Sequence, residues 1–174
     1  MDLSSIICAV MMATNMWNAD TACKHMDTVV EASEEYSVPA ELMNALILTE
    51  SAWSPAAVSH AGACGLTQVM PKYTGGGATG GIKYTCEQLT SNPKLSIRLG
   101  TRIYRYWLTK YAKCSTKKCS KSQHRIALCG YNAGYRCKGE NPNRHGMYYA
   151  KKVLERAARL SRLVQRHKAT HKVD

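Results

Sequence analysis

Acidic residues are scarce in the second half of the chain. Residues 93–174 hold three acids against 21 Lys and Arg residues, a balance of +18, whereas residues 1–92 hold nine acids against three, a balance of −6. The 174 residues together carry +12. A half this cationic indicates a polyanionic partner, which could be nucleic acid, an acidic cell-wall polymer or an anionic membrane surface. Between residues 51 and 154 only Glu87 and Glu140 are acidic, so a site built from paired carboxylates has few candidates.

Long apolar runs are also missing. The run from Ile6 to Ala13 is far shorter than the ~20 residues that a membrane-spanning helix needs. Its length is that of a signal-peptide core, but Asp2 precedes it in place of a basic residue and no small-x-small cleavage site follows. We therefore expect residues 1–26 to be an N-terminal segment with a weak export signal. A buried N-terminal helix is the alternative.

Strand-like alternation is almost absent, and the chain has no internal repeat. With 174 residues, this pattern predicts a single, mainly α domain. We expect helices over residues 27–36 with Asp27 as N-cap, from Pro39 to Glu50, and over residues 93–111, 122–130 and 148–166. Residues 54–81 are predicted to form a loop. Its glycine cluster is no phosphate-binding loop, because Ile82 stands where the lysine of that motif belongs.

Eight cysteines form an even set, which is typical of disulfides made in an oxidising compartment. Because eight cysteines allow 105 pairings, the count alone assigns none. Cys114, Cys119, His124 and Cys129 lie five residues apart and resemble a loosened zinc knuckle, the basis for an alternative as a basic nucleic-acid-binding protein. Zinc knuckles space their first two cysteines more closely, so we expect no metal or other cofactor and regard nucleic acid as the less favoured partner.

One carboxylate lies on an apolar helix face. Met43, Leu46, Ile47 and Glu50 follow the spacing of a single face, which places Glu50 in the last turn. Burial and the negative end of the helix dipole both disfavour the charged form, so we expect the pKa of Glu50 to be raised. A general acid at neutral pH needs such a pKa. An exposed Glu at a frayed helix end is the alternative.

Three ordered motifs carry a family resemblance. They are Glu50-Ser51 with Ser59 and then Gly62-x-x-Gly65-Leu66-x-Gln68-x-Met70-Pro71; Tyr131-Asn132-Ala133-Gly134; and Tyr149 followed by Val153-Leu154. In this order and spacing they resemble the soluble lytic transglycosylase family. The resemblance covers residues 27–157 and implies a lysozyme-like catalytic domain of the goose-type and lytic transglycosylase kind. Residues 158–174 are then a basic extension of the last helix.

The resemblance implies a reaction on peptidoglycan glycan strands. Glu50 would protonate the glycosidic oxygen between N-acetylmuramic acid and N-acetylglucosamine. It would then remove the proton from the muramic acid's own C6 hydroxyl, closing an anhydro ring. No second carboxylate is needed, because the substrate's N-acetyl group can stabilise the cationic centre, and this agrees with the few acids that follow Glu50.

Further site residues are implied by the same motifs. Ser59 would orient the substrate N-acetyl group, with a loop-stabilising hydroxyl as the alternative. The remaining substrate-binding residues are expected to be Gln68, Met70, Tyr131, Asn132 and Tyr149, of which the tyrosines would assist Glu50 by hydrogen bonding. The chain departs from the family at Cys64, inside the glycine motif, and at Gly130, where Ala is usual. Cys64 implies a disulfide that holds this loop, with Cys86 as the expected partner.

Three questions of function stay open at this point. A hydrolytic muramidase of the same fold is the alternative enzyme, and it would need Glu87 or Glu140 to position water. The enzyme is expected to act outside the cytoplasm, in the periplasm, secreted or on a virion, and a secretion, conjugation or phage machine is a candidate user. The basic C-terminal half is expected to bind anionic envelope polymers or lipid head groups.

Overall fold

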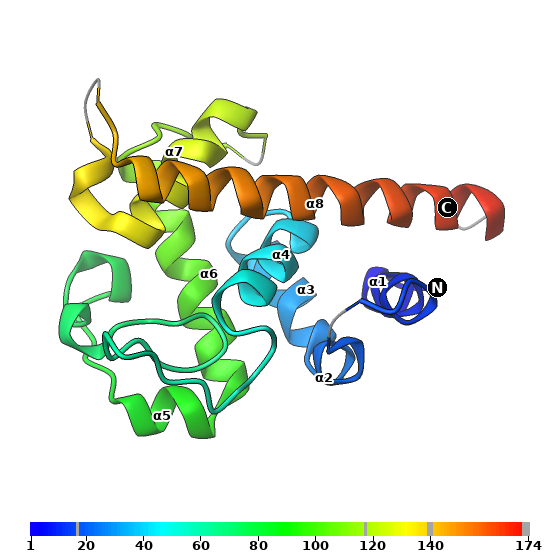
Figure 1. Ribbon diagram of the computed structural model, residues 1–174, viewed down its shortest axis with the longest axis horizontal. Helices are drawn as coiled ribbons and strands as arrows, with labels where there is room; N and C mark the ends of the chain where they lie inside the picture. The colour runs from blue at the N-terminus through cyan, green and yellow to red at the C-terminus, as the bar shows by residue number, and fades with distance from the viewer. Residues whose placement is uncertain (17, 117, 139–140, 172–174) are drawn as a thin grey trace.

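The computed structural model describes residues 1–16, 18–116, 118–138 and 141–171, which are mostly helical (Figure 1). Its elements are α1 (Leu3–Ala13), α2 (Ala19–Lys24), α3 (Met26–Glu35), α4 (Ala40–Glu50), η1 (Pro71–Tyr73), η2 (Gly77–Thr79), α5 (Cys86–Ser91), α6 (Pro93–Lys110), α7 (Lys121–Ala133), η3 (Gly134–Cys137) and α8 (Arg144–His171). In these ranges extended pairing is limited to two isolated bridges, Val58 with Cys64 and Cys64 with Val69. The mainly α prediction is confirmed.

Two of the predicted helix starts were wrong by a residue. Asp27 lies in the first turn of α3 and is not its N-cap, because α2 ends at Lys24 and His25 serves as both the C-cap of α2 and the N-cap of α3. Pro39 likewise caps α4 from outside the helix. The last two helices are longer than expected, since Ser120 forms a capping box at the start of α7 and α8 begins at Arg144.

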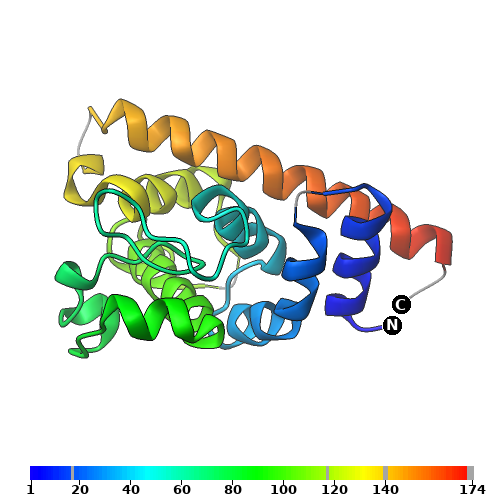
Figure 2. The same cartoon turned by 60° about the horizontal axis from the view of Figure 1, so that its bottom comes forward.

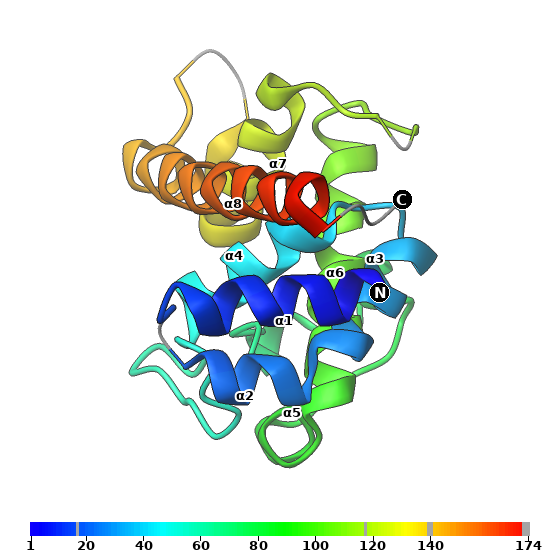
Figure 3. The ribbon, with the colours of Figure 1, turned by 90° about the vertical axis from the view of Figure 1, so that its right-hand side faces the viewer.

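The long helix α8 organises the core. It packs against α4, α7 and, near its C-terminal end, α1, which lies beside α2 when α8 is viewed end-on (Figures 1 and 3). Ile6, Ile7 and Val10 of α1 are at most 5% exposed, and Leu160 and Val164 of α8 are 1% exposed in the same cluster. Residues 1–26 thus include a buried helix, which was the alternative to an export signal. The export signal stays a prediction.

All eight cysteines are paired, as Cys8–Cys23, Cys64–Cys86, Cys114–Cys119 and Cys129–Cys137. The prediction of disulfides is confirmed, including the expected partner of Cys64. Since the three knuckle cysteines are oxidised, they are not thiolate ligands, and His124 instead lies 2.6 Å from the hydroxyl of Tyr104. The zinc-knuckle alternative therefore loses its ligand set.

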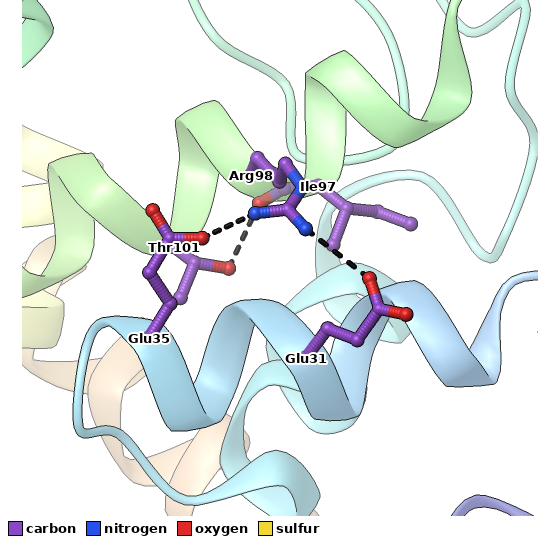
Figure 4. A network of polar contacts seen from close by, with 5 residues as sticks. All are labelled: Glu31, Glu35, Ile97, Arg98 and Thr101. Atoms are coloured by element: carbon purple, nitrogen blue, oxygen red, sulfur yellow. Dashed lines mark hydrogen bonds and ion pairs between the residues drawn. The ribbon is translucent and has the colours of Figure 1, made fainter.

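Part of the acidic N-terminal half is used to join helices. Arg98 of α6 contacts Glu35 and lies 3.1 Å from Glu31, both on α3 (Figure 4). These groups are exposed, so the pairs contribute little, up to about 1 kcal/mol each. Thr101, one turn beyond Arg98, bonds to the carbonyl of Ile97 in its own helix. Glu31 and Glu35 thus form surface links between α3 and α6.

Among the described residues, no helix combines the length and the apolar character that crossing a membrane requires.

Candidate active site

The segment from Ser51 to Thr85 is a long loop that crosses between α4 and α5 (Figure 2). Its course depends on Gly65, which has a φ of +74° and lies so close to α5 that a Cβ would sit 2.3 Å from the carbonyl oxygen of Leu89. No other residue fits there without displacing the backbone. The Cys64–Cys86 disulfide joins the same two segments. The loop is therefore held firmly against α5.

Glu50 is the last residue of α4, and Tyr149 of α8 donates a 2.6 Å hydrogen bond to its Oε1. The predicted apolar face is confirmed, since Met43, Leu46 and Ile47 are fully buried. Burial raises the pKa of Glu50 from its ordinary 4.5 to about 7, and the Tyr149 hydrogen bond opposes this rise. The carboxyl group is thus largely protonated at slightly acidic pH and partly so at neutral pH.

Two tyrosines surround this carboxyl group. Tyr149 is 8% exposed whereas its neighbour Tyr148 is 68% exposed, so Tyr149 is the member of the pair that reaches Glu50. Tyr131 of α7 donates to the backbone oxygen of Thr67 at 2.7 Å, which ties α7 to the loop. Burial, with a smaller contribution from the charge of Glu50, raises the pKa of both tyrosines well above 10. Both phenols therefore keep their protons and act as donors.

The turn after Glu50 is strained. Ala52 and Trp53 have φ values of +51° and +63°, and left-handed backbone costs about 1–2 kcal/mol at a non-glycine residue. The hydroxyl of Ser51 donates to the carbonyl of Leu66 at 2.8 Å, and Asn18 donates to the carbonyl of Ala52 at 2.5 Å. Such strain concentrates at functional sites, where surrounding contacts maintain it.

The other predicted residues of the first motif stabilise the loop. The hydroxyl of Ser59 accepts a hydrogen bond from the N–H of Ala63 at 3.0 Å. This contact fits the alternative in which Ser59 stabilises the loop, and the Ser59 proton is still available to a ligand. Gln68 donates to the carbonyls of Ala57 and Gly65 at 3.1 and 3.0 Å. Substrate binding by either residue stays a prediction.

The last two predicted residues of the sugar groove are Met70 and Asn132. Met70 is partly buried and Asn132 is exposed on α7. Their expected place along the sugar groove is not contradicted by these positions, and it too stays a prediction.

Two contacts near the site escaped the sequence analysis. Arg156 of α8 donates to the hydroxyl of Thr49, the residue before Glu50, at 2.8 Å. At Gly130 a Cβ would lie 2.4 Å from the ring of Trp107, which explains why this chain lacks the usual Ala. The only sequence signal for the first contact was the seven-residue spacing from Tyr149 to Arg156, which puts both on one face of α8.

The raised pKa of Glu50 gives a direct prediction for the pH dependence of activity. If the protonated carboxyl group is the acid, kcat/KM should fall about tenfold per pH unit above pH 7, because the active form is lost there. Initial rates on soluble glycan fragments at constant ionic strength measure this profile. A rate that stays flat to pH 9 would contradict protonated Glu50 as the active form.

The fold and this site together define a mainly α domain that presents one carboxyl group of raised pKa beside a long loop. The chain belongs to the soluble lytic transglycosylase family, because the Transglycosylase SLT domain matches residues 27–153. The resemblance carried by the three motifs is thereby confirmed.

The chain spans less than a third of the length of the similar proteins. The membrane-bound lytic murein transglycosylases C of Sodalis glossinidius and Edwardsiella ictaluri are 44% and 47% identical over 54 residues, which is 31% of this chain and 15% of theirs. An inactive mutant of lytic transglycosylase Slt from Pseudomonas aeruginosa superposes with a TM-score of 0.64 at 19% identity, over 91% of this chain and 30% of its own. The 70 kDa soluble lytic transglycosylase Slt70 from Escherichia coli superposes with a TM-score of 0.63 at 22% identity, over 90% of this chain and 28% of its own. At such identities the superpositions show the fold, and the lysozyme-like prediction is confirmed.

Proposed function

We propose that this chain is a peptidoglycan lytic transglycosylase, which cleaves the β-1,4 bond between N-acetylmuramic acid and N-acetylglucosamine and forms 1,6-anhydro-N-acetylmuramic acid. The observation that carries the proposal is Glu50, a carboxyl group with a pKa of about 7 that receives a hydrogen bond from Tyr149. Family membership supports the same reaction.

The proposed mechanism uses one carboxyl group twice. Protonated Glu50 gives its proton to the glycosidic oxygen, so the bond to C1 of the muramic acid breaks and N-acetylglucosamine leaves as the alcohol. The substrate's N-acetyl group stabilises the positive charge at C1, while the Tyr149 hydroxyl stabilises the new Glu50 carboxylate. Glu50 then takes the proton from the C6 hydroxyl as O6 bonds to C1. Glu50 ends protonated, and no water is consumed.

A hydrolytic muramidase remains the second candidate, and it depends on another carboxylate to position water. Glu87 is exposed on α5, while Glu140 lies outside the described residues. The scarcity of acids after Glu50, with Glu87 and Glu140 alone between residues 51 and 154, favours the transglycosylase.

The two candidates differ in the mass of their products. We expect mass spectrometry of digested peptidoglycan to show fragments one water lighter than those from a hydrolytic lysozyme digest of the same wall, with no new reducing ends. Glycan fragments that end mainly in reducing muramic acid would assign the chain to the hydrolases.

We also propose that the protein acts outside the cytoplasm. Four disulfides support an oxidising compartment such as the periplasm, the medium or a virion. Use by a secretion, conjugation or phage machine is part of this proposal, since such a machine needs local wall opening. Cell fractionation tests the compartment, and recovery of the protein from the cytoplasm with reduced cysteines would contradict it.

The basic end of α8 is proposed to hold the enzyme on anionic envelope polymers or lipid head groups. Arg159, Arg162, Arg166 and Lys168 lie along it, while its apolar residues Leu160 and Val164 are buried in the core cluster. Screening should weaken such binding, because the Debye length falls from about 10 Å at 0.1 M salt to about 3 Å at 1 M. Sedimentation with cell envelopes that does not change with salt would contradict it.

A further inference from the structure

Arg156 is oriented toward the end of α4 by a chain of two hydrogen bonds. Its Nη1 donates to Oγ1 of Thr49 at 2.8 Å, and that hydroxyl in turn donates to the carbonyl of Ala45 at 2.7 Å. Because the Thr49 proton is used on Ala45, its oxygen can only accept from the guanidinium. Both side chains are partly buried. The guanidinium is therefore fixed one residue away from Glu50.

The charge of this guanidinium is not neutralised by the described part of the chain. The ion pairs there use Arg98 and Lys151, and the neighbouring acid, Glu155, lies 3.8 Å from Lys151. An arginine has five N–H donors, of which Thr49 takes one. Four donors of a partly buried cation are thus left for water or for a ligand.

Arg156 forms no ion pair with Glu50. The pKa of Glu50 is set by burial and by Tyr149, and no cation lowers it. Tyr149 and Arg156 are two helical turns apart on one face of α8, about 10 Å along its axis. A cation paired with Glu50 would keep it ionised and remove the acid, whereas one held at Thr49 is free to bind an anion of the substrate.

We propose that Arg156 determines substrate specificity by binding a carboxylate that the muramic acid carries beside the scissile bond. This inference rests on the proposed function, because muramic acid is the sugar that bears a lactyl ether there. That group ends in a peptide with carboxylates of its own, or in a free lactyl carboxylate once the peptide is removed. The planar guanidinium presents paired N–H donors that match a carboxylate. The substrate class is then an acidic glycan, as distinct from a neutral one such as chitin.

Binding to an inactive protein tests the proposal without turnover. The Glu50→Gln protein and the Glu50→Gln/Arg156→Gln protein are titrated with three ligands: a peptide-bearing muro-oligosaccharide, the same sugar after amidase treatment, and a chito-oligosaccharide without lactyl groups. We expect Arg156→Gln to raise the Kd of acidic ligands about tenfold and that of the chito-oligosaccharide less than about twofold. If affinity for the amidase-treated sugar falls, Arg156 binds the lactyl carboxylate. If affinity falls only for the peptide-bearing sugar, Arg156 binds a carboxylate of the peptide.

Three further variants in the same background separate binding from folding. Thr49→Val keeps the cation but removes its anchor, so a smaller loss with the same selectivity is expected. Arg156→Lys keeps the charge without the paired donors. Its Kd for the acidic ligands should lie between those of the Arg156 protein and the Arg156→Gln protein. Lys24→Gln removes an equal charge from an exposed position on α2, outside the basic C-terminal half, and should keep the selectivity of the parent protein.

Two outcomes overturn the inference. One is an equal loss for all three ligands, which would make Arg156 a structural residue, and the other is no loss for any. Product analysis of the wild-type digest judges the proposed function separately. If the products proved hydrolytic while Arg156→Gln still lost only acidic ligands, the reaction would be reassigned and the carboxylate site would stand.

Discussion

Replacing Glu50 with Gln is expected to lower the rate of peptidoglycan lysis by about a thousandfold while the protein stays folded. Gln keeps the size and polarity of the side chain but has no proton to transfer. A positioned acid or base contributes about 10²- to 10⁴-fold, and here one group serves in both steps. Turbidity clearing of a wall suspension and release of soluble fragments measure the loss.

The same substitution should stabilise the protein above pH 7. Between pH 4.5 and about 7 folded wild-type protein keeps a proton on Glu50 that the unfolded chain releases, so its stability falls as pH rises through this window. In the Glu50→Gln protein this contribution to the pH dependence of the unfolding free energy is lost, because an amide does not titrate. We expect Glu50→Gln to be more stable at pH 8 by about 3 kcal/mol, a gain that grows from pH 5 to 8 in denaturant titrations.

Glu87→Gln is the matched control, since it removes an exposed carboxylate on α5 by the same change of atoms. We expect it to keep wild-type activity. Glu50 would not be the acid if the folded Glu50→Gln protein still cleared walls at a tenth of the wild-type rate or more. A similar loss in Glu87→Gln would instead favour the hydrolytic candidate.

Reduction of the disulfides is expected to produce the largest change in stability. Each native bridge in a small exported domain contributes about 2–5 kcal/mol, and a whole domain has about 5–15 kcal/mol of unfolding free energy. With four bridges reduced, the melting temperature should fall by roughly 15 °C or more. Thermal unfolding followed by circular dichroism, with and without reductant, measures this change.

Removing single bridges tests which one supports the site. The Cys64–Cys86 pair spans 22 residues and holds the loop that carries Gly65, whereas Cys114–Cys119 spans five. Because a longer closed loop restricts the unfolded chain more, the Cys64→Ser/Cys86→Ser protein should lose more stability than Cys114→Ser/Cys119→Ser. An unchanged melting temperature in reductant, with eight titratable thiols in untreated protein, would show that the bridges do not form.

Periodicity predicted the elements that present the site. Glu50 could be placed on a buried face because Met43, Leu46 and Ile47 lie seven, four and three residues before it on one side of the helix, and burial then explains its raised pKa. The third motif selected Tyr149 over Tyr148, a choice that helical periodicity alone could not make. Which of the two faces Glu50 depends on the rotation of α8 against α4, and Tyr149 is the buried one.

Single contacts between distant segments could not be predicted from a sequence pattern. Arg156 meets Thr49 across 107 residues, and Gly130 accommodates Trp107 from another helix. Each is a fit between two surfaces, so neither residue alone indicates its partner. The order of the motifs along the chain was informative because a family retains it, whereas the contact between Arg156 and Thr49 is visible only in the folded structure.

The packing of α1 against the end of α8 has a consequence for the order of synthesis. Ile6, Ile7 and Val10 are covered by a core that includes Leu160 and Val164, about 150 residues later in the chain. At translation rates of about 5–20 residues per second, roughly 8–30 s separate the appearance of the two surfaces. During that interval α1 can pack against its near neighbours α2 and α3, but the part of its apolar face that α8 covers stays open to a chaperone or an export receptor. The nascent chain therefore cannot complete this core before α8 emerges.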